Sequence, residues 1–380
     1  MKRRMQRLER MMQHSVAFQN KLLLGLVGKA KGTKWGKKYK FSNISNYENF
    51  VKNVPLQDYE SMKPLIEQIR KGKQNLLWPT EIKWFAKSSG TTNAKSKFIP
   101  VSMESLEDCH YAAGKDLLCM YLNNNENSQM FTGKSLRLGG SKELYRENGT
   151  AFGDLSAILI DNMPLWAEFS STPSNKVSLM SDWEYKMQAI VDETINENVT
   201  SLTGVPSWML VLLNNVLETT GKKNLFDVWP NLEVYFHGGV SFSPYKDQYK
   251  KILPQSGFKY YEIYNASEGF FAIQDKNNSS ELLLMLDYGI FYEFMPTEEY
   301  GKEKPRTIGL SKVELDKNYA LVISTNGGLW RYLVGDTIKF TSLSPFRIIV
   351  TGRLKQFINA FGEEVMVDNT DKAIAAAAAA

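Results

Sequence analysis

Residues 84–102 read WFAKSSGTTNAKSKFIPVS, with five consecutive hydroxyl-bearing or glycine residues between two apolar, strand-like runs. The five are Ser88, Ser89, Gly90, Thr91 and Thr92, and Lys97 follows in the second run. Hydroxyl groups and the backbone N–H groups of a glycine-containing loop can bind phosphate oxygens, and a lysine can neutralise the phosphate charge. The stretch therefore predicts a polyphosphate-binding loop, and a plain hairpin turn is the alternative.

A second candidate cluster lies in YYEIYNASEGFF, residues 260–271, where Tyr264 precedes small residues and Glu268. An aromatic ring followed by a tight backbone and one carboxylate can stack on adenine and hold Mg²⁺ against phosphates. The alternative is an aromatic strand that ends in a turn with a solvent-facing glutamate.

Two further motifs place charged residues directly after glycines. In LWRYLVGDTIKF, Asp336 follows Gly335 at an expected turn between strands, where one carboxylate can accept hydrogen bonds from both hydroxyls of a ribose. In VTGRLK, Arg353 and Lys355 follow an expected glycine turn. Ordinary hairpins would explain each motif singly, so the interpretation depends on the order of all four motifs along the chain.

Other reaction classes find no support in the sequence. It has no GxSxG motif, only three histidines for a Ser-His-Asp triad, and no GxGxxG motif for a dinucleotide. The net charge is +5, but residues 1–40 carry twelve Lys and Arg against one acid, which leaves −6 for the remainder. We interpret the basic segment as a solvated helix face and expect no nucleic-acid partner.

The cysteines and the apolar runs bear on the compartment. Cys109 and Cys119 are ten residues apart and fit neither a CxxC metal site nor a disulfide framework. The first apolar run, residues 22–27, is far shorter than the ~20 residues that span a bilayer. A cytoplasmic protein with no membrane partner is therefore expected.

Residues 1–60 read as helices and loops, and strands are expected at 81–88 and 95–102. Ser102 is expected to cap a helix whose apolar residues recur at three-and-four spacing, which places His110 in the core. LSAILI (155–160) and LEVYFHGG (232–239) are expected strands, and strands dominate from about residue 258. Mixed elements followed by a β-rich end predict an α/β fold with mixed sheets and a small β-barrel-like part.

The series SSGTT, YNASEG, YLVGD and TGRLK resembles the adenylate-forming superfamily of acyl-activating enzymes. The segments KFSNISNYENFVKNVPLQDYE, TGVPSWMLVLL and VWPNLEVYFHGGVSF are similar to one branch, the auxin-responsive promoter family of acyl acid–amido synthetases in its bacterial form. The resemblance implies an N-terminal adenylation domain over residues 1–352. It also implies a hinge and the start of a mobile C-terminal domain over 353–374, most of which is expected to be missing. Residues 375–380 are interpreted as placeholder alanines.

The same resemblance implies roles for individual residues. The ATP site is expected to comprise Ser88, Ser89, Gly90, Thr91, Thr92, Tyr264, Asn265, Ala266, Ser267, Glu268, Asp336 and Arg353. Tyr264 would lie on the adenine, Glu268 would bind Mg²⁺, and Asp336 would hold the ribose. Lys97, Glu268 and Arg353 are the expected catalytic residues, and Lys355 falls at the hinge. Asn93-Ala94-Lys95-Ser96 stands where many relatives carry Gly-x-Pro before the lysine.

The implied activity is ATP- and Mg²⁺-dependent activation of a small carboxylic acid as an acyl-adenylate, followed by amide formation with an amino acid. Alternatives are transfer of the acyl group to a thiol of coenzyme A or a carrier protein, and a non-catalytic nucleotide-binding relative. No obligate protein partner is expected. Val205, Trp208, His237 and Gly238 are candidates for the acyl pocket, because such sites are mostly apolar and aromatic; ordinary core packing is the alternative.

Overall fold

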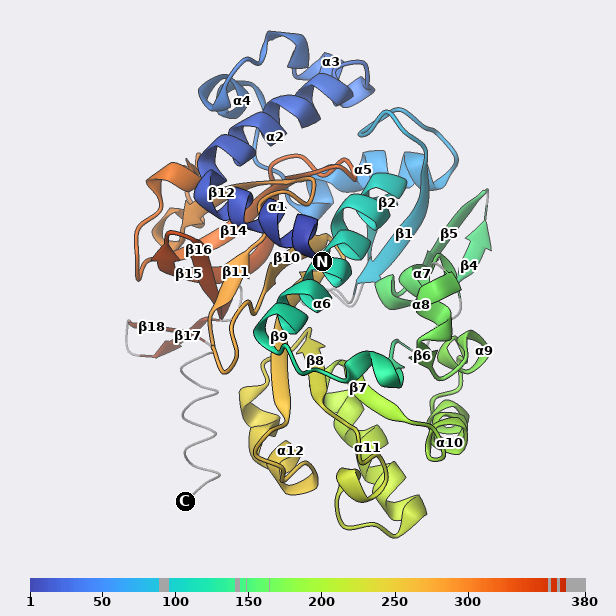
Figure 1. Cartoon of the computed structure of the whole chain (residues 1–380). Coiled ribbons are helices and arrows are strands. Elements are labelled where there is room, and N and C mark those ends of the chain that lie inside the picture. The colour runs from blue at the N-terminus through green and yellow to red at the C-terminus, as the bar shows by residue number, and fades with distance from the viewer. Residues whose placement is uncertain are drawn as a thin grey trace.

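The computed structural model describes residues 1–88, 96–140, 144–147, 149–163, 165–354, 357–360 and 363–366 (Figure 1). Its helices are α1 (Lys2–Gln13), α2 (Ser15–Ala30), α3 (Lys34–Lys38), α4 (Tyr47–Asn53), α5 (Tyr59–Arg70), α6 (Ala112–Asn124), α7 (Leu155–Asp161), α8 (Leu165–Phe169), α9 (Asn175–Ser178), α10 (Trp183–Thr194), α11 (Pro206–Thr220) and α12 (Lys246–Ile252). Its strands are β1 (Ile82–Ser88), β2 (Lys97–Ser102), β3 (Lys134–Leu138), β4 (Tyr145–Glu147), β5 (Thr150–Gly153), β6 (Ser171–Thr172), β7 (Val199–Gly204), β8 (Val234–Gly238), β9 (Lys259–Ala266), β10 (Gly269–Ile273), β11 (Leu282–Leu284), β12 (Ile290–Pro296), β13 (Ile308–Gly309), β14 (Asn318–Thr325), β15 (Tyr332–Leu343), β16 (Phe346–Arg353), β17 (Phe357–Ala360) and β18 (Glu363–Met366).

A mixed sheet of twelve strands runs through the described part of the chain, in the order β13-β12-β14-β15-β16-β11-β10-β9-β8-β7-β3-β6. Neighbouring strands pair antiparallel from β13 to β9 and parallel from β9 to β6. The predicted α/β fold with mixed sheets is therefore confirmed. Strand β9 is the point where the two halves meet, and ligands of open α/β sheets bind outside the carboxyl ends of parallel strands.

A smaller sheet, in the order β2-β1-β5-β4, lies beside the large one in the described chain (Figure 1). Strands β1 and β2 pair antiparallel, as expected for residues 81–88 and 95–102, and β1 pairs parallel with β5. The hairpin of β1 and β2 therefore lies next to the antiparallel half of the large sheet.

Helices cover both faces of the parallel half (Figure 1). Helices α10, α11 and α12 bury their apolar side chains against one face, in a cluster that includes Leu202 of β7 and Tyr235 of β8. Helix α6 covers the other face, where Tyr121 contacts Phe236 and Tyr261 with ring centroids 5.5 and 5.1 Å away. Burial on both faces is typical of parallel strands.

Polar contacts anchor the N-terminal helices to the antiparallel half and to α6. Gln19 of α2 donates to the carbonyls of Leu286 and Ile290 at 2.8 and 3.0 Å. Arg4 and Arg7 of α1 both contact Asp116 of α6, whose carboxylate is fully buried. Two of the twelve cations in residues 1–40 therefore pair with a buried carboxylate, while their own side chains stay 32% and 38% exposed.

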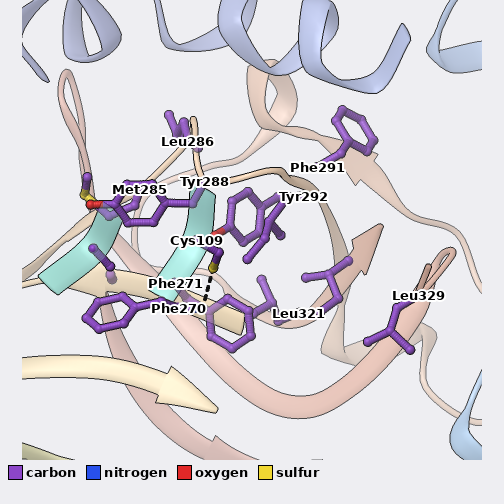
Figure 2. Close-up of a cluster of buried hydrophobic side chains, with 14 of the residues drawn as sticks. Cys109, Phe270, Phe271, Met285, Leu286, Tyr288, Phe291, Tyr292, Leu321 and Leu329 are labelled. Atoms are coloured by element: carbon purple, nitrogen blue, oxygen red, sulfur yellow. Dashed lines mark hydrogen bonds between the residues drawn. The ribbon is translucent and has the colours of Figure 1, made fainter. Parts of the chain in front are cut away.

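The main core fills the space between these helices and the antiparallel strands. Figure 2 shows aromatic and aliphatic side chains of this cluster, including Phe270, Phe271, Tyr288 and Tyr292, around the thiol of Cys109. The Cys109 Sγ accepts a hydrogen bond from the Phe270 N–H at 3.2 Å. Among the described residues, no helix is long and apolar enough to cross a bilayer.

Most of the expected elements are confirmed, and one is wrong. Ser102 Oγ accepts a hydrogen bond from the Ser105 N–H at 3.0 Å, as a cap does, and His110 is 6% exposed. LSAILI, however, forms helix α7 and not a strand. A six-residue apolar run does not distinguish a buried strand from a buried helix. Here tertiary contacts decide, because Leu159 O accepts a hydrogen bond from the Tyr111 hydroxyl at 2.9 Å.

Candidate active site

The described residues include one end of the predicted phosphate loop. Ser88 ends β1 and lies opposite Lys97, the first residue of β2. The rest of the loop, Ser89, Gly90, Thr91 and Thr92, lies outside the described residues, as does the predicted hinge residue Lys355. The roles of these residues stay predictions.

Tyr59 at the start of α5 fixes the beginning of β2. Its hydroxyl accepts a hydrogen bond from the Phe98 N–H at 2.8 Å, and Lys97 Nζ lies 5.8 Å from the centre of its ring. Asp58 caps α5 by accepting a hydrogen bond from the Ser61 N–H at 2.9 Å. The ammonium group of Lys97 thus lies close to the end of the β1–β2 pair at which Ser88 and Lys97 face each other.

Asp336 joins three strands of the large sheet. Tyr264 of β9 donates its hydroxyl proton to Asp336 Oδ2 at 2.8 Å, and Arg353 Nε of β16 lies 2.9 Å from Oδ1. Asp336 is 6% exposed, whereas the Arg353 side chain is 45% exposed. Each carboxylate oxygen still has a lone pair free for a further hydrogen bond. The pair therefore presents a fixed acceptor beside a solvent-accessible cation.

The backbone around Asp336 and Arg353 differs from the expected turns. Both residues lie inside strands β15 and β16, opposite each other in the ladder. The preceding glycines, Gly335 and Gly352, have φ angles of +99° and +142°, and the pairing register slips beside both. These positions are β-bulges, which add a residue and re-aim side chains next to binding sites. The prediction of turns is wrong because the chain continues the sheet through the glycines.

Glu268 lies at the turn between β9 and β10 and is partly buried. Burial raises the pKa of Glu268, and the neighbouring Asp336 carboxylate raises it further, while Lys97 and Arg353 lower it. Lys97, Asp336 and Arg353 all influence the pKa of Glu268, and Asp336 and Arg353 form an ion pair.

The remaining predicted ATP-site residues follow the carboxyl end of β9. Asn265 and Ala266 end the strand, and Ser267 lies with Glu268 in the turn. Gly238, at the end of the neighbouring strand β8, allows the two backbones to approach closely. A Cβ atom there would lie 2.4 Å from Ile263 O, a clash with backbone.

Tyr264 is buried and has two contacts that fix its ring. The ring packs against Phe271 with centroids 4.9 Å apart, and the hydroxyl is held by Asp336. Its stacking on adenine stays a prediction. The observed role is to position Asp336.

Tyr332, four residues before Asp336, was not singled out from the sequence. It is fully buried, and burial raises its pKa, with the nearby Glu268 carboxylate raising it further. The residue stands in the same YLVGD motif as Asp336, so the motif itself was a signal for it. Its backbone pairs with that of Gln57, just before α5.

Arg331 holds this part of the strand in place. Its guanidinium contacts both carboxylate oxygens of Glu293 at 2.9–3.1 Å and the carbonyl of Val54 at 2.6 Å. Its carbonyl accepts the Gln57 N–H at 2.9 Å, and its φ angle of +45° is unusual for a non-glycine residue. The segment that precedes α5 is thereby joined to the start of β15.

The predicted acyl-pocket residues divide between the edge and the interior of the sheet. Val205 and Gly238 lie at the carboxyl ends of β7 and β8. Trp208 of α11 is 40% exposed and meets Trp183 edge to face at 5.8 Å. His237 instead packs against Phe242 with ring centroids 4.2 Å apart, on the face that α11 and α12 cover.

The charge state of His237 is fixed by this packing. Burial lowers its pKa to about 3, and among the described residues its Nδ1 has no hydrogen-bond partner. Glu262 lies opposite His237 in the ladder, and burial raises its pKa to about 7. Both groups are therefore disfavoured in their charged forms.

Glu268 is the carboxylate predicted to hold a divalent metal, and this role stays a prediction. No three His, Cys, Asp or Glu side chains gather into a metal cage within the described part of the chain. Mg²⁺ is usually bound through one or two carboxylates together with substrate phosphates, so a site with a single glutamate is compatible with this ion.

Family models match two parts of the chain. The GH3 family N-terminal domain matches residues 4–258, and the GH3 family central domain matches residues 283–353. The chain is 22% identical to indole-3-acetic acid-amido synthetase GH3.3 of Arabidopsis thaliana, over 88% of this chain and 66% of that relative. It therefore spans slightly less than two thirds of that relative's length.

Solved structures share the fold. The acyl acid amido synthetase AtGH3.15, in complex with 2,4-DB, superposes with a TM-score of 0.82 at 18% identity, covering 98% of this chain and 74% of that one. A 2-hydroxyisobutyryl-CoA ligase in complex with 2-HIB-AMP and CoA gives a TM-score of 0.59 at 12% identity, covering 93% and 78%. The architecture is thus that of GH3 synthetases and adenylate-forming ligases.

Proposed function

Because this chain belongs to the GH3 family, we propose that it is an ATP-dependent acyl acid–amido synthetase. It activates a carboxylic acid as an acyl-adenylate and then joins the acyl group to an amino acid. An amino acid acceptor is supported by the relatives, which include amido synthetases of acyl acids and a jasmonoyl–L-amino acid synthetase of Nicotiana attenuata.

One observation carries the proposal: Tyr264 and Arg353 hold the Asp336 carboxylate in place. Asp336, Lys97 and Arg353 also all influence the pKa of Glu268. A fixed carboxylate suits the two hydroxyls of a ribose, and the two cations suit the phosphates that extend from it. This supports a nucleotide that lies across β9, β15 and β16, with its phosphates toward the β1–β2 hairpin.

The first step is attack of the substrate carboxylate on the α-phosphate of ATP, with pyrophosphate as the leaving group. It needs no protein nucleophile, because positioning and charge neutralisation lower the barrier of phosphoryl-centre chemistry. Lys97 and Arg353 neutralise phosphate charge, and Asp336 orients the ribose. In the second step an amine attacks the acyl carbon and AMP leaves.

Glu268 would hold Mg²⁺, which neutralises phosphate charge when it is bound. The raised pKa of Glu268 reflects the free-energy cost of burying an ionised carboxylate. A cation bound beside Glu268 would offset that cost. The cysteines, both free thiols, support a reducing cytoplasmic setting.

Pyrophosphate exchange tests the proposal. The full-length protein is incubated with ATP, Mg²⁺, labelled pyrophosphate and each member of a panel of carboxylic acids, and label in ATP is measured. Acid-dependent exchange is expected, followed by an acyl–amino acid product in mass spectrometry when amino acids are added. If exchange is observed and the addition of coenzyme A yields a thioester, the acceptor is a thiol and not an amino acid. ATP binding without exchange for any acid would overturn the proposal.

A further inference from the structure

A strip of polar side chains lies on one face of the paired strands β3 and β7. In the ladder Ser135 lies opposite Ser201, and Arg137 lies opposite Thr203. Ser135 Oγ and Thr203 Oγ1 are 3.5 Å apart, so these positions share a face. The alternate residues of the two strands, such as Leu136 and Leu202, belong to the apolar core. Parallel strands buried on both faces are normally apolar throughout, so the polar strip is a departure.

Arg137 is the charged member of the strip and is only 9% exposed. Its guanidinium donates to Asn175 Oδ1 at 2.5 Å and to Met163 Sδ at 2.6 Å. Among the described residues, Arg137 Nε has no partner, and neither does the buried hydroxyl of Ser201. Two donors on one face therefore have no acceptor within the part of the chain that the structure describes.

Glu168 is linked to Arg137 through Asn175. Glu168 accepts a hydrogen bond from Asn175 Nδ2 at 2.7 Å, and Asn175 in turn contacts Arg137. Burial lowers the pKa of Arg137, and Glu168 opposes this. A buried cation with no carboxylate in direct contact is costly, so an anion supplied by a ligand would stabilise this arrangement.

The strip lies near the proposed reaction centre. Strands β3, β7, β8 and β9 end at the same edge of the sheet, and Arg137 and Thr203 are each one residue from the ends of their strands. Three strand spacings separate β3 from β9, which is about 14 Å. A substrate whose reacting carboxylate lies beside the β9 turn could extend along this edge toward Arg137.

We propose that Arg137 determines acid specificity by binding a second carboxylate, so that the substrates of this chain are dicarboxylic acids. The planar guanidinium fork matches a carboxylate with two hydrogen bonds, and Ser201 and Thr203 offer hydroxyls beside it. This inference rests on the proposed function, because it names the class of acid that the same site takes.

The test compares α,ω-dicarboxylic acids from glutarate to azelate with monocarboxylic acids of the same carbon count in pyrophosphate exchange. The wild-type chain is expected to prefer a dicarboxylic acid, with an optimum at one chain length. Arg137→Met is expected to lower kcat/KM for that acid by about 10- to 100-fold and leave the monocarboxylic acid unchanged. Lys134→Met, which removes an exposed cation of the same strand paired with Glu197, is the control and should leave both unchanged.

Equal exchange with both classes of acid, or equal losses for both in Arg137→Met, would overturn the inference. Calorimetric titration of the wild-type chain with the same acids measures their binding affinities. It depends neither on turnover nor on whether a variant folds. Exchange that fails with every acid would refute the proposed function. In that case, tighter binding of the dicarboxylic acid would still support the role of Arg137, and equal or absent binding of the two classes would refute it.

Discussion

Asp336 shows how one residue gains a role from partners far away in the sequence. Its two contacts come from Tyr264 and Arg353, which lie on different strands. The left-handed backbone of Gly335 turns the Asp336 side chain toward them at a bulge. The carboxylate is therefore oriented before any ligand arrives, which lowers the entropic cost of binding one.

Asp336→Ala is expected to weaken AMP binding by about 1.5–3 kcal/mol, because hydrogen bonds between the carboxylate and the ribose are charge-assisted. Calorimetric titration with AMP measures the change. Asp275→Ala serves as the matched control, since Asp275 also pairs with an arginine of β16, Arg347 at 2.6 Å, but lies outside the proposed site. An AMP affinity that both substitutions leave unaltered would contradict the ribose role.

At the scale of elements, Lys186 of α10 connects the segment after β3 to the end of α9. Its ammonium donates to the carbonyls of Gly139 and Gly140 after β3, at 3.2 and 2.9 Å, and of Ser178 in α9 at 2.7 Å. The side chain is fully buried, and burial lowers its pKa to about 8 while Asp154 opposes this. At pH 7 the group still carries its proton, so all three N–H bonds are used.

Lys186→Met should lower the free energy of unfolding by about 2–3 kcal/mol, because three carbonyls lose their donor and only part of the cost is regained by removing a buried charge. Urea denaturation followed by circular dichroism measures it. Lys176→Met is the matched control on α9, where the side chain is exposed, and it should leave stability unchanged. Indistinguishable curves for the two variants would show that the three contacts contribute little.

At the scale of the whole molecule, each half holds a buried histidine that folding keeps neutral. Burial lowers the pKa of His237 to about 3 and that of His110 to about 4. The ordinary value is ~6.5, so the unfolded chain binds more protons than the folded chain below that pH. Stability is therefore lost as the pH falls from about 6.5 toward the folded values.

Between pH 7 and pH 5, each histidine is expected to remove about 1–2 kcal/mol of stability. On going from pH 7 to pH 5, the free energy of unfolding of His237→Gln should fall by about 1–2 kcal/mol less than that of the wild-type chain. Urea denaturation at both pH values measures the difference. Glu262, with a pKa raised to about 7, opposes this trend in both proteins, so the difference between them isolates His237. Parallel losses in the two proteins would refute a neutral buried His237.

The sequence by itself determined the local elements and the family. Strands β1 and β2, the Ser102 cap and the core position of His110 follow from short-range patterns, because alternation, capping and helical periodicity act within a few residues. The four motifs resembled the adenylate-forming superfamily, and the shared fold of solved adenylate-forming ligases confirms that architecture.

Only the tertiary structure decided what depends on distant pairing. LSAILI is a helix because of what packs against it, and the glycines before Asp336 and Arg353 mark bulges because the sheet continues through them. The contact of Arg331 with Glu293 joins positions 38 residues apart, which no local pattern predicts. Long-range contacts of this kind place side chains in space, whereas the linear spacing of residues constrains only their neighbours along the chain.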